Sequence, residues 1–168
     1  SQYTKKLIID VRMDVTFKKC EKLKPVQYKP NPKFGTVFAP HLLRIDFDST
    51  KMEHLEAHIV PYGSEPFKPS SIVLHYGQSI FEGLKVFRQG DGSVAAFRAN
   101  LHAKRFMKSA EKLAMPPIDE HVFLSCLDEY LKYEKDSVPS EDDHALYLRP
   151  LMIGRDDQVK VSRSKNYT

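Results

Sequence analysis

Two residues near the C-terminal end of the chain have the types and the spacing to bind a carboxylate. Tyr147 and Arg149 lie two apart in a segment that alternates like a strand, so both side chains leave the same face of a sheet. A guanidinium offers paired donors in a fixed fork, and the tyrosine hydroxyl adds a further polar group. Because most surface arginines have no ligand, an ordinary exposed sheet face is the alternative.

Arg105 is the second candidate for binding an anion. It lies in residues 103–114, whose apolar residues recur at helical spacing, and it sits about 140° around the helix from the apolar stripe. This periodicity predicts an exposed, solvated arginine. The functional alternative is an anchor for a phosphate at the mouth of a cleft. His102, one turn earlier, would support Arg105 or cap the start of the helix.

Aromatic residues surround a turn in the middle of the chain. Tyr76, Phe81 and Glu82 flank or lie within the glycine-bounded segment 77–83. These aromatic rings fit either a plain hydrophobic core or the walls of an apolar substrate pocket. The sequence has no glycine-rich phosphate loop, no cluster of metal ligands and no nucleophile elbow. The residues by themselves allow an anion site but define no reaction.

The strands that would position these residues are visible as alternating segments. The first runs through residues 9–17, where apolar and polar residues alternate, and the second through residues 43–47. Residues 84–88 and 94–98 flank a turn with two glycines, which predicts a β-hairpin. The strand that carries Tyr147 is the last element that we predict.

Two helices are predicted after the hairpin. Residues 103–114 form the amphipathic helix, and Pro116 and Pro117 end it. Asp119 is placed to cap the next helix, whose apolar stripe contains Phe123, Leu127, Tyr130 and Leu131. Cys126 lies near this stripe, which favours a buried thiol over a reactive one.

The middle of the chain and its N-terminal part give weaker local signals. Residues 53–69 carry prolines and predict short strand pieces and loops. Residues 71–76 are apolar and β-prone, and segment 77–83 predicts a short helix after them. Residues 18–33 are rich in lysine and proline and predict an exposed connection.

Strands with helices inserted between them predict an α+β fold, with a mainly antiparallel sheet and a few flanking helices. We divide the chain into an N-terminal strand and exposed linker, residues 1–33, and a small domain, residues 34–168. No internal repeat or low-complexity segment argues for another architecture.

Composition and charge narrow the classes of partner. The chain has 168 residues, of which 41% are hydrophobic and 29% charged. Its formal net charge of +4 is scattered along the chain, so we expect no nucleic-acid partner. No apolar run is long enough to cross a bilayer, and residues 1–6 lack the apolar stretch of a signal peptide, so we expect a cytoplasmic protein that makes no membrane contact. Cys20 and Cys126 indicate neither a disulfide framework nor a metal site.

Four segments, in order along the chain, together form a specific pattern. Residues 34–38 read FGTVF, and residues 75–88 read HYGQSIFEGLKVFR. Residues 96–98 then lead to Arg105, and residues 146–154 contain LYLRP followed by IG. This pattern resembles the FGT-F, HYGQ-IFEGLKA-R and LY-RP---IG blocks and the arginine-bearing helix of the branched-chain amino acid aminotransferases.

The resemblance implies a fold-type IV enzyme with pyridoxal 5'-phosphate as its cofactor. Such an enzyme transfers an amino group reversibly between leucine, isoleucine or valine and 2-oxoglutarate. The chain would be its small N-terminal domain, and the enzyme would be at least a homodimer. D-amino acid transaminases, aminodeoxychorismate lyases and a stand-alone binding module are the alternatives.

The resemblance also assigns roles to individual residues. Arg105 corresponds to the arginine that binds the cofactor phosphate. Arg149 would accept the distal carboxylate of glutamate or 2-oxoglutarate. The pocket for the branched side chain would be lined by Phe34, Phe81 and Tyr147. Tyr76 and Val161 would reach into the active site of the neighbouring subunit.

Three positions depart from the family pattern or lie outside it. His102 stands where branched-chain enzymes often have asparagine. Neither Lys160 nor Lys165 lies in the motif of the lysine that forms a Schiff base with the cofactor. We therefore expect that lysine beyond Thr168, in a C-terminal domain that this chain lacks, and we expect no transaminase activity from the chain alone.

Overall fold

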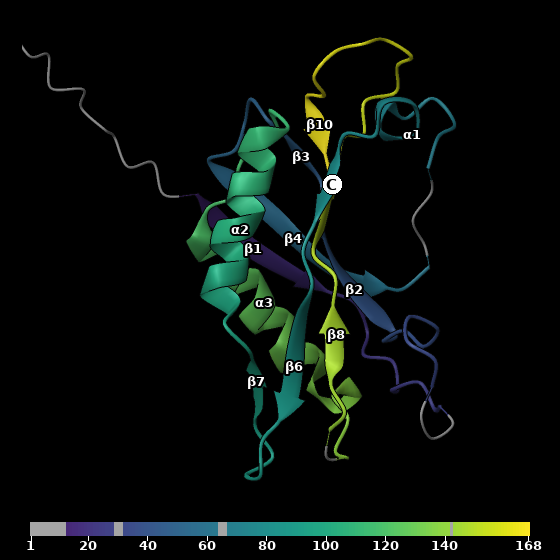
Figure 1. Ribbon diagram of the computed structural model, residues 1–168, viewed down its shortest axis with the longest axis vertical. Coiled ribbons are helices and arrows are strands. Elements are labelled where there is room, and N and C mark those ends of the chain that lie inside the picture. The colour runs from purple at the N-terminus through teal and green to yellow at the C-terminus, as the bar shows by residue number, and fades with distance from the viewer. Residues whose placement is uncertain (1–12, 29–31, 64–66, 142) are drawn as a thin grey trace, which may run out of the picture.

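The structure is a computed structural model that describes residues 13–28, 32–63, 67–141 and 143–168. Several small sheets are joined along the length of the molecule, and two long helices lie together on one side (Figure 1). None of the described helices is long and apolar enough to cross a membrane.

The described N-terminal part of the chain forms a three-stranded sheet in the order β1-β4-β2. Its strands are β1 (Asp14–Lys19), β4 (His54–Pro61) and β2 (His41–Ile45). β1 runs parallel to β4, and β2 runs antiparallel to it. The part of the first predicted strand before residue 13 lies outside the described residues.

The prediction of short strand pieces and loops for residues 53–69 is confirmed as to the presence of strand but wrong about its length. β4 is an eight-residue strand in the centre of the sheet. Leu55, Ala57 and Ile59 are buried and alternate with less buried polar residues. This alternation is the period of a half-buried strand, and the prolines of the region fall at or after the end of β4.

The other strands form three small antiparallel sheets. One sheet pairs β3 with β10, the second pairs β5 with β9, and the third has the order β7-β6-β8. The bounds of these strands are β3 (Phe47–Asp48), β5 (Ser79–Phe81), β6 (Leu84–Arg88), β7 (Val94–Ala96), β8 (Leu146–Leu148), β9 (Leu151–Ile153) and β10 (Asn166–Tyr167). Among the strand pairs of the described residues, β1 and β4 pair in parallel and the others are antiparallel. The predicted α+β class with mainly antiparallel strands is therefore confirmed. β9 and β10 correct the prediction that the strand of Tyr147 is the last element.

Between residues 71 and 83 the structure has helix where the sequence predicts strand, and strand where it predicts helix. The β-prone segment forms a short helix, α1 (Ile72–Tyr76), and the predicted helix contains the strand β5. Gly77 ends α1 with a left-handed φ of 65° and donates its N–H to the carbonyl of Val73. β5 forms because β9, far along the chain, supplies its hydrogen-bonding partner.

The two long helices agree with the sequence signals. α2 (Ala99–Lys112) buries Ala103, Phe106 and Ala110. α3 (Glu120–Glu134) begins after Asp119, whose carboxylate accepts the N–H of His121 at 2.7 Å, so the predicted cap is confirmed. A 3₁₀ turn, η1 (Lys135–Ser137), follows α3.

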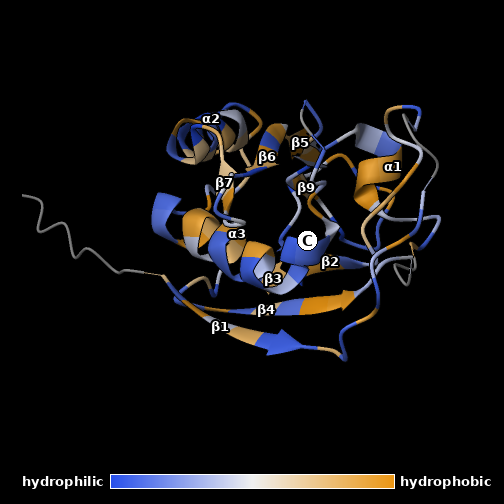
Figure 2. Ribbon diagram, turned by 90° about the horizontal axis from the view of Figure 1, so that it is seen from below, coloured by the Kyte–Doolittle hydropathy of each residue, from blue (hydrophilic) through white to orange (hydrophobic). Residues whose placement is uncertain are grey.

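The elements are arranged in layers around α3. Figure 2 shows α3 above the β1-β4-β2 sheet, with α2 and the strands β5 to β7 on its other side. A core cluster joins these layers through Leu55, Ile80, Phe106, Ala110, Met115, Ile118, Val122, Met152 and Tyr167. Because β5 and α2 share this core, the residue after β5 is brought beside the exposed face of α2.

Candidate functional site

Arg105 is held by a buried carboxylate. Glu82, directly after β5, is only 4% exposed. Its Oε1 accepts from Arg105 Nε and its Oε2 accepts from Arg105 Nη2, both at 2.6 Å. The Arg105 side chain itself is 64% exposed. Arg105 is therefore solvent-facing, as its helical position predicts, and is also fixed by a two-point pair.

The electrostatics of this pair follow from its geometry. The two hydrogen bonds from Arg105 hold the pKa of Glu82 below its usual value, and a bond from His102 adds to this effect. The same pair raises the pKa of Arg105. Both groups are therefore charged across the physiological range, and the buried carboxylate has its counter-ion.

His102 supports the carboxylate and does not act as a simple helix cap. Its Nδ1 lies 3.0 Å from Glu82 Oε2. An ionised carboxylate only accepts hydrogen bonds, so Nδ1 carries the hydrogen. His102 and Arg105 thus hold the same carboxylate from two positions of α2.

A second group of residues gathers around Tyr147 and Arg149. Arg149 Nη2 donates to the Tyr147 hydroxyl at 2.9 Å, so the shared face predicted from their spacing is confirmed. The Arg149 guanidinium lies over the ring of Phe81, 4.4 Å from its centroid. Phe34 meets the ring of Tyr147 edge-on at 5.1 Å. Four residues from distant parts of the chain therefore form one aromatic and cationic cluster.

The segment 81–83 joins the two groups. Phe81 lies under Arg149, and Glu82 binds Arg105. Gly83 leaves room for Tyr147, because a Cβ at this position would lie 2.7 Å from Tyr147 Cζ and closer still to the hydroxyl oxygen. Three consecutive residues thus fix both the exposed arginine and the aromatic cluster.

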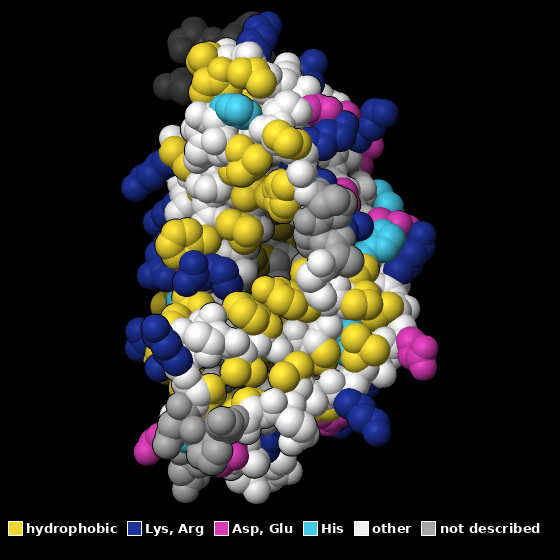
Figure 3. All heavy atoms as spheres, turned by 90° about the vertical axis from the view of Figure 1, so that its right-hand side faces the viewer, with side chains coloured by type: hydrophobic (Ala, Val, Ile, Leu, Met, Phe, Trp, Pro, Cys, Tyr) yellow, Lys and Arg dark blue, Asp and Glu magenta, His cyan; other side chains and the backbone are white. Residues whose placement is uncertain are grey.

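An open cleft of about 1290 Å³ runs beside this cluster. Phe34, Tyr147 and Arg149 form part of its wall, together with Lys85 on β6. Figure 3 shows this side of the molecule, where hydrophobic side chains gather around a hollow. The cleft therefore offers an apolar wall with cationic and hydroxyl groups at one side, which suits a molecule with an apolar part and a carboxylate.

Of the predicted site residues, Phe81 and Arg105 are not among those that line the cleft, and neither are the two remaining ones. Tyr76 is on α1 and is 43% exposed. Val161 lies in the connection between β9 and β10 and is 83% exposed. The structure brings neither of them to the cleft, and their assignment to a neighbouring subunit stays a prediction.

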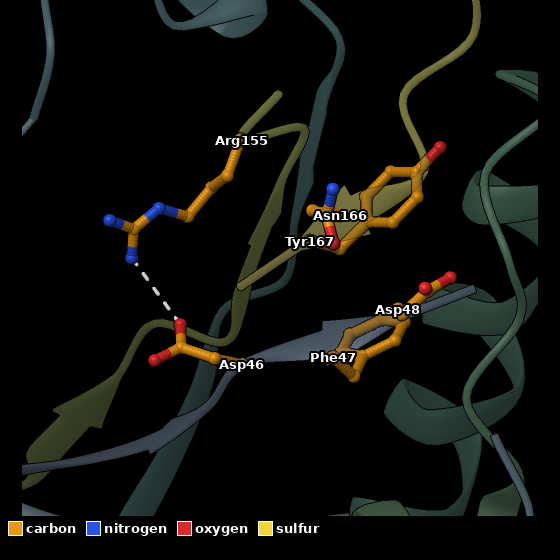
Figure 4. Close-up of a pocket in the computed structure, with 6 residues that line it drawn as sticks. All are labelled: Asp46, Phe47, Asp48, Arg155, Asn166 and Tyr167. Atoms are coloured by element: carbon orange, nitrogen blue, oxygen red, sulfur yellow. Dashed lines mark hydrogen bonds and ion pairs between the residues drawn. The ribbon is translucent and has the colours of Figure 1, made fainter. Parts of the chain in front are cut away.

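A smaller hollow of about 360 Å³ lies between β3 and β10. Figure 4 shows its lining, in which Arg155 Nη1 lies 3.3 Å from Asp46 Oδ1. Asp46 also accepts the hydroxyl of Thr168, and Asp48 accepts from Thr50. These acidic groups are engaged by their neighbours, so this hollow has a structural explanation. Across the described ranges, no group of three or more His, Cys, Asp and Glu residues is arranged to hold a metal ion.

Comparison with known proteins identifies the family. No family model matches the chain. A branched-chain-amino-acid transaminase of Bacillus subtilis is 39% identical over 153 residues, which are 88% of this chain and 43% of the relative. A branched-chain-amino-acid aminotransferase of Mycolicibacterium smegmatis is 40% identical over 138 residues, 82% of this chain and 37% of the relative. This chain belongs to the branched-chain aminotransferase family. It spans about two fifths of the length of the relatives that it matches.

Solved structures of branched-chain aminotransferases share the fold. The enzyme of Thermoproteus uzoniensis with norvaline superposes with a TM-score of 0.54 at 17% identity, over 74% of this chain and 38% of that one. The T.th. enzyme, complexed with N-(5'-phosphopyridoxyl)-L-glutamate, superposes with a TM-score of 0.53 at 23% identity, over 73% of this chain and 38% of that one. At this identity the likeness concerns the fold alone.

Glu82 and Gly83 are the residues of this chain whose roles sequence reasoning missed. The sequence places Glu82 in a turn with aromatic neighbours and assigns it no role. A charged residue in the otherwise apolar run 80–84 must be exposed or paired, which is the signal that could have drawn attention to it. Its partner, 23 positions away, leaves no local signal.

Proposed function

We propose that this chain is the small domain of a pyridoxal 5'-phosphate enzyme that transfers the amino group of leucine, isoleucine or valine to 2-oxoglutarate. The observation that carries the proposal is the cluster in which Arg149 bonds Tyr147 and covers Phe81. It supplies both an apolar wall and a carboxylate receiver, and one pocket of the proposed enzyme needs both. The family relationship supports the proposal.

The donor set of Arg105 fits the phosphate of the cofactor. Glu82 engages the Nε–H and one N–H of Nη2, and His102 Nδ1 lies 3.4 Å from Nη2, which leaves the two N–H groups of Nη1 for a ligand. When bound, the cofactor supplies an electron sink for chemistry at the α-carbon of the amino acid. Arg105 would anchor it at the exposed face of α2.

The cluster residues would orient the two kinds of substrate. Phe34, Phe81 and Tyr147 would contact the branched side chain and exclude water from it. The guanidinium of Arg149 would pair with the distal carboxylate of 2-oxoglutarate or glutamate, with the Tyr147 hydroxyl beside it. The same pocket would then accept an apolar and a charged side chain by using different atoms of the cluster.

The organisation of the whole protein is part of the proposal. Residues 34–168 would form the small domain, preceded by the N-terminal strand and linker of residues 1–33. The lysine that holds the cofactor would belong to a further domain. Exposed Tyr76 and Val161 would contribute to a second subunit in a homodimer, which sedimentation of the complete protein would test. We also propose a cytoplasmic location, which suits the two free thiols.

The substrate assignment is tested by Arg149→Ala in the complete protein. We expect the apparent affinity for 2-oxoglutarate to fall about tenfold to a hundredfold, since a charged hydrogen-bonded pair is lost. The affinity for leucine should change little. Lys112→Ala, which removes an exposed positive charge at the end of α2, is the control. Equal losses for both substrates would contradict the role of Arg149.

A further inference from the structure

The Glu82 side chain is buried and paired, although a residue next to a turn could equally be exposed to solvent. Its side chain is 3% exposed, and both of its oxygens receive hydrogen bonds from α2. Buried carboxylates are rare unless they are paired, and here the partner is a largely exposed arginine. A pair that only stabilised the fold would not need the guanidinium to remain open to solvent.

Building on the proposed role of Arg105, we propose that Glu82 is a positioning residue, which fixes the Arg105 guanidinium so that its unused N–H groups form a preset phosphate receiver. The Glu82 carboxylate accepts hydrogen bonds from the Nε and Nη2 edge of the Arg105 guanidinium. The Nη1 edge is left for the ligand. Without Glu82 the long arginine side chain would have to be ordered by the phosphate itself, at a cost in conformational entropy.

The anchor of this arrangement is rigid. The N–H of Glu82 donates to the carbonyl of Pro150 at 2.9 Å. Ile80 and Leu84, on either side of the segment, are both buried. Glu82 therefore directly follows β5, which pairs with β9. Its position is fixed by these strands, and its carboxylate in turn fixes an arginine on α2. His102, bonded to the same carboxylate, further restricts the orientation of the carboxylate.

Positioning and simple electrostatics predict opposite effects of removing Glu82. The carboxylate brings a negative charge next to Arg105, which weakens the attraction of the site for a phosphate. If net charge governed binding, Glu82→Gln would tighten phosphate binding. If the fixed orientation governs binding, the same change weakens it, because an amide cannot accept two charge-assisted bonds from the fork.

The experiment compares two ligands that differ only in the phosphate. The dissociation constants of pyridoxal 5'-phosphate and of pyridoxal are measured by absorbance titration of the complete apoprotein. We expect Glu82→Gln to weaken pyridoxal 5'-phosphate about tenfold and to leave pyridoxal unchanged. Glu111→Gln on the exposed face of α2 makes the same change in net charge and should leave both constants unchanged.

A second variant separates the orientation of Arg105 from the charge of residue 82, and thermal unfolding shows whether each variant is folded. Glu82→Asp retains the negative charge but is one methylene too short to hold the fork in place. We expect a similar loss for pyridoxal 5'-phosphate alone, with thermal unfolding recorded for each variant. Wild-type or tighter binding of the phosphate form by either folded variant would overturn the positioning role.

The failure of the proposed function gives a different result. Arg105→Ala should weaken pyridoxal 5'-phosphate and not pyridoxal, and adding Glu82→Gln to it should cause no further loss. If Arg105→Ala leaves the phosphate form unaffected, Arg105 is not the anchor and the proposed function loses its cofactor site. If Arg105→Ala weakens binding but the Glu82 variants do not, only the positioning role is wrong.

Discussion

The hydroxyl of Tyr147 occupies the space into which a side chain at Gly83 would project. A Cβ on Gly83 would meet Tyr147 Cζ at 2.7 Å, well inside van der Waals contact. Gly83 directly follows the residue that holds Arg105, and Tyr147 accepts the hydrogen bond of Arg149. This close approach therefore sets the position of the aromatic cluster relative to the exposed arginine of α2.

Gly83→Ala tests this contact. The added methyl group must displace the Tyr147 ring, and overpacking of this kind costs about 1–3 kcal/mol. We expect a lower thermal midpoint and a weaker response to 2-oxoglutarate. Gly90→Ala is the matched control, because a Cβ there meets nothing within 4 Å. Equal midpoints for the two variants would show that Tyr147 can move aside freely.

Tyr147→Phe separates the hydroxyl from the ring. The ring contact with Phe34 is kept, while Arg149 loses the oxygen to which it donates. A single hydrogen bond contributes about 0.5–1.5 kcal/mol, so we expect the KM for 2-oxoglutarate in the complete enzyme to rise several-fold. The KM for leucine should stay within twofold.

The control for this substitution is Tyr133→Phe, which removes the hydroxyl that donates to the Cys20 carbonyl at 2.8 Å. It should leave the ratio of the two KM values unchanged, even if it lowers stability. A ratio that shifts equally in both variants would mean that Tyr147 plays no special part in binding the carboxylate.

Local chemistry explains which parts of the fold could be predicted. α3 was found because Asp119, its cap, precedes an apolar stripe, and the hairpin of β6 and β7 was found because a glycine turn separates two β-prone runs. β5 and β9 were missed because each is three residues long and depends on the other, about 70 positions away. Their stability comes from pairing, which no local pattern records.

The candidate site divides in the same way. Tyr147 and Arg149 were predicted to share a face because they are two apart on one strand, and their hydrogen bond confirms it. Arg105 was predicted to be exposed from its helical angle. Its pairing with Glu82 could not be predicted, because it depends on how β5 and α2 pack on a common core.

The Arg105–Glu82 pair gives stability a defined dependence on pH. The pair lowers the pKa of Glu82 from its usual 4.5, so its contribution is present above that value and is lost as the pH falls through the lower pKa of the folded protein. Glu82→Gln should therefore reduce the urea midpoint at pH 7, and the gap to the wild type should narrow as the pH falls below 4.5. Glu111→Gln should show no such narrowing, and a gap for Glu82→Gln that stays constant with pH would contradict this assignment.

The thiol of Cys126 should be unreactive in the folded protein. Partial burial raises its pKa to about 12, because the thiolate loses solvation where this half-buried side chain packs against the core cluster at the wall of the cleft. Only the thiolate attacks iodoacetamide, so at pH 8 we expect Cys126 to be alkylated far more slowly than in denaturant. Mass spectrometry of peptides after timed alkylation measures both cysteines in one sample. Cys20, outside this core cluster, is the internal reference, and alkylation of Cys126 at the rate found in denaturant would mean that packing against the core cluster does not protect this thiol.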